Sequence, residues 1–349
     1  MDAVIRSPLQ VEWADGARLE TARTRHPPPC PPQILTSITV ISAPYHVGLR
    51  DSPIHRSRVS EGPDYLKSAG LLSLLRAQNL PIHELEIPPV ADAFEGEIGR
   101  TFELIRRVSL AVTAARNRAS FPIVLAGNCC ISVGVAAGLW GSDELRGAED
   151  DALGCVWFDA HDDYNVPDSM VSGYFDSQGI AMMAGECWRA LVSSVPGFRP
   201  WLLRRVVHCG MRDVNELERG RVEASDMGVV SGDATKKVDF AAGVRKELEE
   251  RFVEGNDAAV LVHLDVDVMD ATLGKANPFA CSGGLFEEDI TGCMAAILDK
   301  TAPMAFTIAS FDPLCDGDES AQRLAGLSIK AVEGVLNGLK GRGLLQPRD

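Results

Sequence analysis

Short runs of apolar, often β-branched residues alternate along most of the chain with stretches of helical periodicity, and this alternation constrains the fold most strongly. The strand-like runs are residues 38–42, 122–126, 155–158, 205–209, 258–264 and 305–308. The helical patterns lie at 63–78, 97–116, 240–252, 287–298 and 320–339. Strands that are apolar throughout are typical of a sheet covered on both faces, with helices as the crossovers. The chain is therefore predicted to be a three-layer α/β/α protein with a mostly parallel sheet.

The N-terminal segment differs from the rest of the chain. Residues Arg25 to Pro32 read Arg-His-Pro-Pro-Pro-Cys-Pro-Pro, and five of these eight residues are proline. Proline cannot continue a helix or occupy a central strand, so residues 1–34 are predicted to form an extended Pro-rich arm. A solvated tail is favoured over an arm that clamps an oligomer. Because no low-complexity linker divides the remainder, residues 35–349 are predicted to be a single catalytic domain.

Charge and cysteine content restrict the partners and the compartment. The net charge of −15 argues against nucleic acid and anionic membranes, since both require a basic surface. Nine cysteines without a C-x-x-C pair indicate a reducing compartment. No apolar run approaches the roughly 18 residues that cross a bilayer, and the N-terminus lacks the pattern of a signal peptide. These features predict a soluble, cytoplasmic protein that binds neither nucleic acid nor membranes.

Acidic residues come directly after two of the predicted strands. Asp159, His161 and Asp163 come directly after the strand at 155–158, and Asp265 and Asp267 end the strand at 258–264. Alternate residues in an extended segment point to the same side, and ligands of parallel sheets bind at the carboxyl ends of strands. The two segments are therefore expected to direct their side chains into one site.

A cation explains why these groups would share a site. Buried like charges cost several kcal/mol each unless they are compensated, and a divalent ion supplies that compensation. Oxygen ligands with one imidazole suit Mn²⁺ or a similar ion, and the carboxylates suffice to bridge a pair of ions. A solvated acidic loop is the alternative for either segment alone, but two such segments behind buried strands favour a metal site.

A third strand-to-helix junction, Val124-Leu-Ala-Gly-Asn-Cys-Cys-Ile, leaves its interpretation open. Cys129 and Cys130 are either packing residues, which the spacing alone favours, or one of them provides a thiolate as a metal ligand or nucleophile. The histidines outside the acidic motif, His263 among them, are interpreted as surface or packed residues.

These motifs resemble those of the ureohydrolase family, which contains arginase, agmatinase and formimidoylglutamase. The resemblance covers most of residues 36–340 and is most specific at 159–163 and 264–267, with looser matches at 62–63, 210–214 and 311–313. It implies an arginase-like fold, two Mn²⁺ ions, and hydrolysis of a linear C–N bond in a small cationic guanidino or amidino compound. It also implies a homo-oligomer, a trimer or a hexamer.

The resemblance assigns roles residue by residue. Asp159 and Asp265 would bridge the ions, His161 and Asp267 would complete one ion, and Asp163 would bind the other and help to pass a proton to the leaving amine. Residues expected to contact the far end of the substrate are Asn165, Ser172, Asp213 and Glu218.

The chain departs from the family pattern at three positions. Cys129 stands where a histidine binds the first ion, and a softer thiolate there would favour Zn²⁺ or Fe²⁺ over Mn²⁺. Asp176 stands where arginases carry a histidine that shuttles protons, and Ser310 where they carry a glutamate that pairs with the guanidinium. Ordinary arginine is therefore not the expected substrate, and Asp312 or Asp176 is a candidate for the missing negative charge.

Two other functions remain open. A single ion held by Asp159, His161 and Asp267 would polarise an amide, as in the deacetylase relatives of the fold. The departures at Cys129, Asp176 and Ser310 would also fit a scaffold or partner subunit that has lost catalysis.

Overall fold

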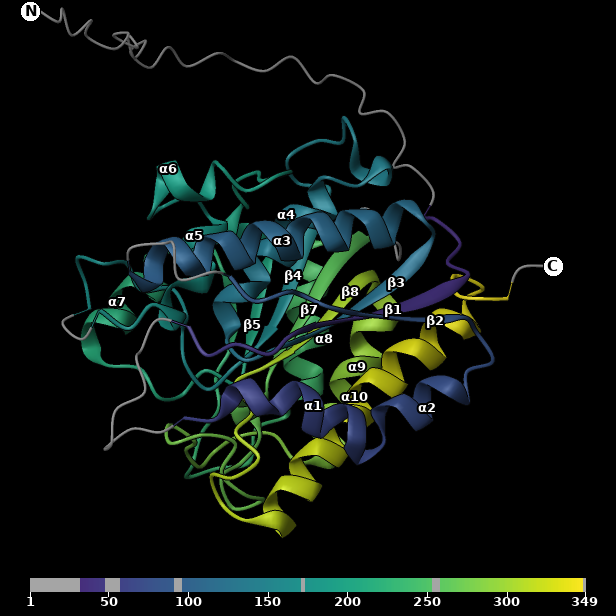
Figure 1. Ribbon diagram of the computed structural model, residues 1–349. Helices are drawn as coiled ribbons and strands as arrows, with labels where there is room; N and C mark the ends of the chain where they lie inside the picture. The colour runs from purple at the N-terminus through teal and green to yellow at the C-terminus, as the bar shows by residue number, and fades with distance from the viewer. Residues whose placement is uncertain (1–31, 48–56, 91–95, 171–172, 253–257, 348–349) are drawn as a thin grey trace, which may run out of the picture. The chain divides into compact units, whose positions relative to one another are not determined.

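The computed structural model describes residues 32–47, 57–90, 96–170, 173–252 and 258–347. The predicted N-terminal arm therefore lies outside the described residues, except for residues 32–34. The described part of the unit from Pro31 to Asp349 is built around one sheet with helices on both faces (Figure 1). The prediction of a three-layer α/β/α arrangement is confirmed.

The sheet has eight strands in the order β2-β1-β3-β8-β7-β4-β5-β6, and every pairing among the described strands is parallel. The strands are β1 (Ser37–Ala43), β2 (Ile82–Glu86), β3 (Ser120–Ala126), β4 (Leu153–Phe158), β5 (Val206–Cys209), β6 (Gly228–Val230), β7 (Ala258–Asp265) and β8 (Thr301–Ala309). The central strands β3, β4 and β8 are buried along their whole length. Full burial explains why these strands are apolar without alternation.

Two apolar cores lie on opposite faces of the sheet. One core packs α3 (Glu97–Asn117), α4 (Ser132–Trp140) and α5 (Gly179–Met183) against the sheet. The other core contains side chains of α1 (Gly62–Leu66), α2 (Leu72–Arg76), α8 (Phe240–Arg251), α9 (Glu287–Lys300) and α10 (Asp318–Gly341). The remaining described helices are α6 (Arg189–Val192) and α7 (Glu216–Glu223). Buried residues of α3 such as Phe102, Ile105 and Val112 recur at helical spacing and form its sheet-facing side.

The predicted helix at 63–78 differs from the observed structure. Helices α1 and α2 are separated by a π-helical turn, Lys67–Leu71, in which Gly70 has φ of 131°. A side chain is strained at such a φ, and glycine relieves the strain because it has no Cβ. The break therefore follows from one residue inside an otherwise helical pattern.

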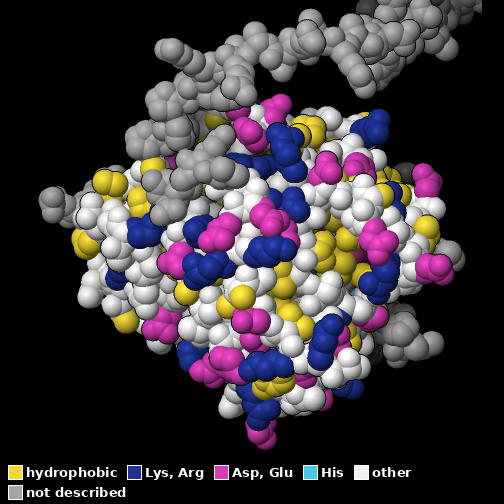
Figure 2. All heavy atoms as spheres, turned by 180° about the vertical axis from the view of Figure 1, so that it is seen from behind, with side chains coloured by type: hydrophobic (Ala, Val, Ile, Leu, Met, Phe, Trp, Pro, Cys, Tyr) yellow, Lys and Arg dark blue, Asp and Glu magenta, His cyan; other side chains and the backbone are white. Residues whose placement is uncertain are grey.

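The surface of the described residues is mixed in charge. On the face shown in Figure 2, Lys and Arg side chains are interspersed with Asp and Glu, and no broad patch of one sign is visible among the coloured residues. Several charged side chains of the described residues form ion pairs within a helix, such as Arg323 with Glu319 and Arg251 with Glu247. Among the described residues, each helix is too short or too polar to span a lipid bilayer.

Candidate metal and substrate site

Four neighbouring strands end at one edge of the sheet, and the predicted site residues follow them directly. The strands are β3, β8, β7 and β4, which are adjacent in the sheet order. They are followed or ended by Cys129, Ser310, Asp265 and Asp159. A cavity of about 230 Å³ opens at this edge. Its acidic lining residues are Asp162, Asp163, Asp176, Asp213, Glu218, Asp265 and Asp267.

The two acidic motifs form the same local turn. The Oδ1 atom of Asp159 accepts a hydrogen bond from the backbone N–H of His161 at 2.7 Å, and Asp265 Oδ1 accepts one from Asp267 N–H at 2.8 Å. Residues Val266–Val268 are a 3-10 turn rather than the extended segment that the spacing predicted. The aspartate side chain bonds to the backbone two residues on, which closes this turn. The turn, rather than strand alternation, brings Asp265 and Asp267 together.

One group of side chains that could hold a metal ion consists of Asp159, His161 and Asp267, whose donor atoms all lie within 4.8 Å of one another. His161 Nδ1 is 3.3 Å from Asp159 Oδ1 and 3.4 Å from Asp267 Oδ2. Burial opposes ionisation of Asp267, yet His161 and Asn277 hold the pKa of this carboxyl below its usual range. Burial likewise acts against the imidazolium form, but Asp267 and Asp159 raise the pKa of His161 well above its ordinary value.

At the neighbouring carboxylates of Asp163 and Asp265, burial and like charges outweigh the compensating contacts. Burial, with the charges of Asp159 and Asp176, raises the pKa of Asp163 well above its ordinary value. Asp163 Oδ2 is buried and has no hydrogen-bond partner among the described residues. Burial and the charges of Asp267 and Asp159 also raise the pKa of Asp265. An uncompensated buried carboxylate is costly, so these residues fit a site for divalent cations.

Cys129 faces the cavity and Cys130 does not line it, which separates the two cysteines that the sequence left equivalent. The Cys129 Sγ atom lies 2.9 Å from Asp265 Oδ2, 3.2 Å from Ser310 Oγ and 3.2 Å from His263 Nε2. Burial and the Asp265 carboxylate raise the pKa of the Cys129 thiol well above its ordinary value. Cys130 is fully buried in the core beside α3 and α4.

Asp176 lines the cavity, but both of its oxygens accept hydrogen bonds. Oδ2 accepts from Asn128 Nδ2 at 2.6 Å, and Oδ1 accepts from the backbone N–H of Cys130 at 2.8 Å. Burial raises the pKa of Asp176 to about 6, although these hydrogen bonds oppose the rise. Asp176 therefore fixes the turn that carries Cys129, in addition to facing the cavity.

The residues predicted to contact the substrate are only partly brought together. Asn165, Asp213, Glu218 and Ser310 line the cavity. Asp312 does not line it, because its carboxylate accepts the backbone N–H groups of Arg58 and Leu314. Ser172 lies outside the described residues. Asn165 Nδ2 donates to Asp162 Oδ1 and Glu218 Oε1 at 3.0 and 3.2 Å, so these three residues form one polar group.

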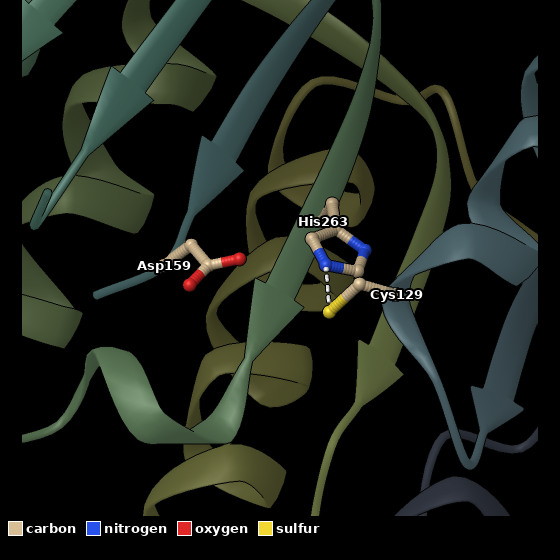
Figure 3. A group of neighbouring side chains, drawn as sticks. All are labelled: Cys129, Asp159 and His263. Carbon is tan, nitrogen blue, oxygen red and sulfur yellow. Dashed lines mark hydrogen bonds between the residues drawn. The ribbon is translucent and has the colours of Figure 1, made fainter. Parts of the chain in front are cut away.

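Several residues of the site were not predicted from the sequence. His263 was interpreted as a surface or packed residue, yet it also contacts Cys129 (Figure 3). It lies two residues before Asp265 on β7, and this period-two spacing is the signal that could have placed both side chains on one face. Tyr174, Asn277 and Phe279 also line the cavity, and they come from loops whose positions no local pattern indicates.

Fold and site together define an open parallel α/β protein with a carboxylate-rich site at the carboxyl ends of its central strands. A sequence profile of the Arginase family matches residues 36–332, and the chain belongs to that family. Arginase-1 of Xenopus laevis is 28% identical over 264 residues, which cover 71% of this chain and 78% of that protein.

Solved structures of similar fold include two named for different ureohydrolases. The arginase of Bacillus subtilis is 23% identical with a TM-score of 0.69, covering 86% of this chain and 98% of the other. The agmatine ureohydrolase of Thermoplasma volcanium is 19% identical with a TM-score of 0.61, covering 88% and 92% respectively. At this level of identity the structural likeness shows the fold alone.

Proposed function

We propose that this protein is a metal-dependent hydrolase that cleaves a linear C–N bond of a small guanidino or amidino compound other than ordinary arginine. The observation that carries the proposal is the convergence of Asp159, His161, Asp163, Asp265 and Asp267 at one cavity or directly behind it. Membership of the Arginase family supports it as well.

Two divalent ions, Mn²⁺ by family resemblance, are proposed to bind here. Asp159, His161 and Asp267 would hold one ion, and Cys129, Asp163 and Asp265 would hold the other, with Asp159 and Asp265 shared. Ions bound at these positions supply Lewis-acid activation of water near neutral pH. The unpartnered Asp163 Oδ2 and the raised pKa of Asp265 favour this arrangement, since both conditions are relieved by a cation.

Asp163 is proposed to handle the proton of the reaction. This role comes from the family resemblance, which assigns Asp163 the transfer of a proton to the leaving amine in addition to its place beside an ion. Asp176 has both oxygens bonded, but its pKa of about 6 places it near the range in which a general acid works at neutral pH. The Asn128 and Cys130 hydrogen bonds would keep its orientation fixed while it does so.

The cavity favours a cationic substrate. Seven of its lining residues are acidic, and no Lys or Arg lines it among the described residues. Phe279 and Tyr174, with ring centroids 5.8 Å apart, supply an apolar side for the carbon chain of the substrate. Asn165, Asp213 and Glu218 are proposed to contact its far end, and Ser310 its reacting end, with Ser172 included by resemblance.

Two further proposals rest on the resemblance and the composition. The protein is proposed to form a homo-oligomer, a trimer or a hexamer, which light scattering would measure. A reducing, cytoplasmic compartment is also proposed. The eight cysteines among the described residues are all free thiols, which agrees with it.

The test is hydrolysis after metal exchange. Protein is stripped with a chelator, reloaded with Mn²⁺, Zn²⁺ or both, and assayed for urea, ammonia or amine across a panel of guanidines and amidines. Asp267→Asn should lower kcat/KM by about 100-fold or more, because even residues that only orient a metal ligand cost 10 to 100-fold. Asp316→Asn is the matched control, since Asp316 does not line the cavity. If reloaded protein released no product from any compound of the panel, the proposed function would be wrong.

A further inference from the structure

Three buried side chains with different donor atoms meet behind the cavity. Cys129 Sγ, His263 Nε2 and an oxygen of Asp159 all lie within 4.8 Å of one another. The three residues are 2%, 0% and 1% exposed. Figure 3 shows the imidazole of His263 directed at the sulfur of Cys129, with the Asp159 carboxylate facing the same space. Cys129 comes from the turn after β3, His263 from β7, and Asp159 directly follows β4, so only the folded sheet brings them together.

The imidazole is held in the orientation of a metal ligand. His263 Nδ1 lies 2.8 Å from Ser132 Oγ at the start of α4. A Nδ1–H donor to that hydroxyl leaves the lone pair on Nε2, which faces Cys129. Histidines that bind metals almost always use the other ring nitrogen in this way.

Trp157 orients two members of the group at once. Its indole stacks on the His263 ring with centroids 3.6 Å apart, and its Nε1–H donates to Asp159 Oδ2 at 3.1 Å. Trp157 and His263 are also register partners on β4 and β7. The donor atoms are therefore fixed by contacts that a packing role alone would not require.

The spacing suits a tetrahedral ion with small adjustment. Zn²⁺ binds sulfur at about 2.3 Å and imidazole nitrogen at about 2.1 Å, which at the tetrahedral angle separates the two donors by about 3.6 Å. The Sγ to Nε2 distance here is 3.2 Å. Asp265 Oδ2 lies 2.9 Å from the same sulfur, outside the group of three whose donor atoms are all within 4.8 Å of one another.

We infer that Cys129, His263 and Asp159 form a Zn²⁺ site, with Asp265 beside the sulfur; this site shares Asp159 with the Asp159, His161 and Asp267 group. Sulfur and nitrogen donors select Zn²⁺ over Mn²⁺, whereas the second group, with two carboxylates and one imidazole, suits the harder ion. In this assignment Zn²⁺ is the ion in one half of the proposed hydrolytic site, and His263 is one of its ligands. The assignment depends on the donor atoms and does not require that the protein turn over a substrate.

Metal content and cobalt spectroscopy test this inference without an activity assay. Full-length protein is stripped and titrated separately with Zn²⁺, Mn²⁺ and Co²⁺, with bound metal measured by elemental analysis. Wild type should bind one Zn²⁺ per chain and give a thiolate-to-Co²⁺ charge-transfer band. His263→Phe keeps a ring against Trp157 but removes the donor, so the Zn²⁺ affinity should fall by about 100-fold and Mn²⁺ affinity by only a few-fold.

Two matched variants separate ligand loss from misfolding. His208→Phe changes another fully buried histidine, on β5, and should leave Zn²⁺ binding unchanged. His161→Asn should weaken Mn²⁺ and spare Zn²⁺. The assignment of the Zn²⁺ site is wrong if His263→Phe binds Zn²⁺ as tightly as wild type. It is also wrong if wild type shows no thiolate-to-Co²⁺ charge-transfer band. Zn²⁺ binding without hydrolysis would reject the proposed function and retain this site, and hydrolysis with Mn²⁺ alone would do the reverse.

Discussion

Replacing Arg212 by methionine should destabilise the fold and weaken metal binding. The reason is that the Arg212 guanidinium donates hydrogen bonds to backbone carbonyls of several loops around the carboxylates of the site. Its Nη2 donates to the backbone carbonyls of Asp267, Met269 and Cys281 at 2.9, 3.2 and 2.9 Å. Its Nη1 and Nε donate to the carbonyls of Gly210 and Ser282 at 2.9 and 3.1 Å. No lysine can span these acceptors, since its three donors share one nitrogen.

The size of the expected loss of stability depends on which of these carbonyls water can reach once the arginine is replaced. Asp267 and Met269 are 2% and 1% exposed, so their carbonyls would remain buried without the arginine donor. Each buried acceptor left unsatisfied costs about 1 to 3 kcal/mol, which gives a loss of about 4 kcal/mol for the two. The carbonyls nearer the surface would bond to water and contribute little. The backbone at Asp267 would also loosen, and metal affinity should fall by about 10-fold or more.

Urea unfolding of chelator-treated protein measures the first effect, and metal titration of the same samples measures the second. Arg323→Met is the control, because Arg323 is an exposed residue that pairs with Glu319, and such pairs contribute about 1 kcal/mol or less. Arg212→Lys should fall between wild type and Arg212→Met. A loss below about 1 kcal/mol for Arg212→Met, with an unchanged m-value, would refute the argument.

Two further predictions concern the pH dependence and the backbone of the site. Burial and the charges of Glu218 and Asp159 raise the pKa of Asp162 to about 7. The folded pKa of Asp162 exceeds its unfolded value, so its ionisation as the pH rises destabilises the folded state. Metal-free protein should therefore lose about 2 to 3 kcal/mol of stability between pH 5 and 7.5 from this group. The urea midpoint of Asp162→Asn should depend less steeply on pH. An equally steep profile in the variant would contradict the assignment. Gly127→Ala should destabilise the fold by about 3 kcal/mol, since the new Cβ would lie 2.1 Å from the backbone oxygen of Tyr45. Gly220→Ala, where the Cβ meets open space on α7, should instead stabilise the fold by about 0.5 to 1 kcal/mol. Thermal unfolding compares them, and equal effects would be inconsistent with the predicted clash.

The fold was largely predictable because the signals that specify it are local. The six predicted strands all occur, within a few residues of their expected bounds. The two strands that were missed, β2 and β6, lie at the edges of the sheet. β2 is mostly exposed and β6 has three residues, so neither carries the apolar run that marks a buried strand. Full burial produces the sequence signal, and edge strands lack it.

The candidate site was predictable only in part. Asp159, His161, Asp265 and Asp267 were found because each motif directly follows an apolar run, and parallel strands end at a common edge. Asp312 was a candidate for the missing negative charge at the substrate, but its carboxylate instead accepts the backbone N–H of Leu314 in its own loop and that of Arg58, which is distant in the sequence. An acidic residue after a strand can thus serve either the cavity or its own turn, and the sequence does not distinguish these two uses.

The sequence by itself determined the layered parallel sheet and the presence of a carboxylate-rich edge, because hydrophobic periodicity and strand ends are read over a few neighbouring residues. Only the tertiary structure decided that Cys129 rather than Cys130 faces the cavity, and that His263 meets Cys129. Cys129 lies 134 residues from His263 and 136 from Asp265 along the chain. Contacts at such separations depend on strand order and register, which are fixed by packing of the whole sheet and not by any local pattern.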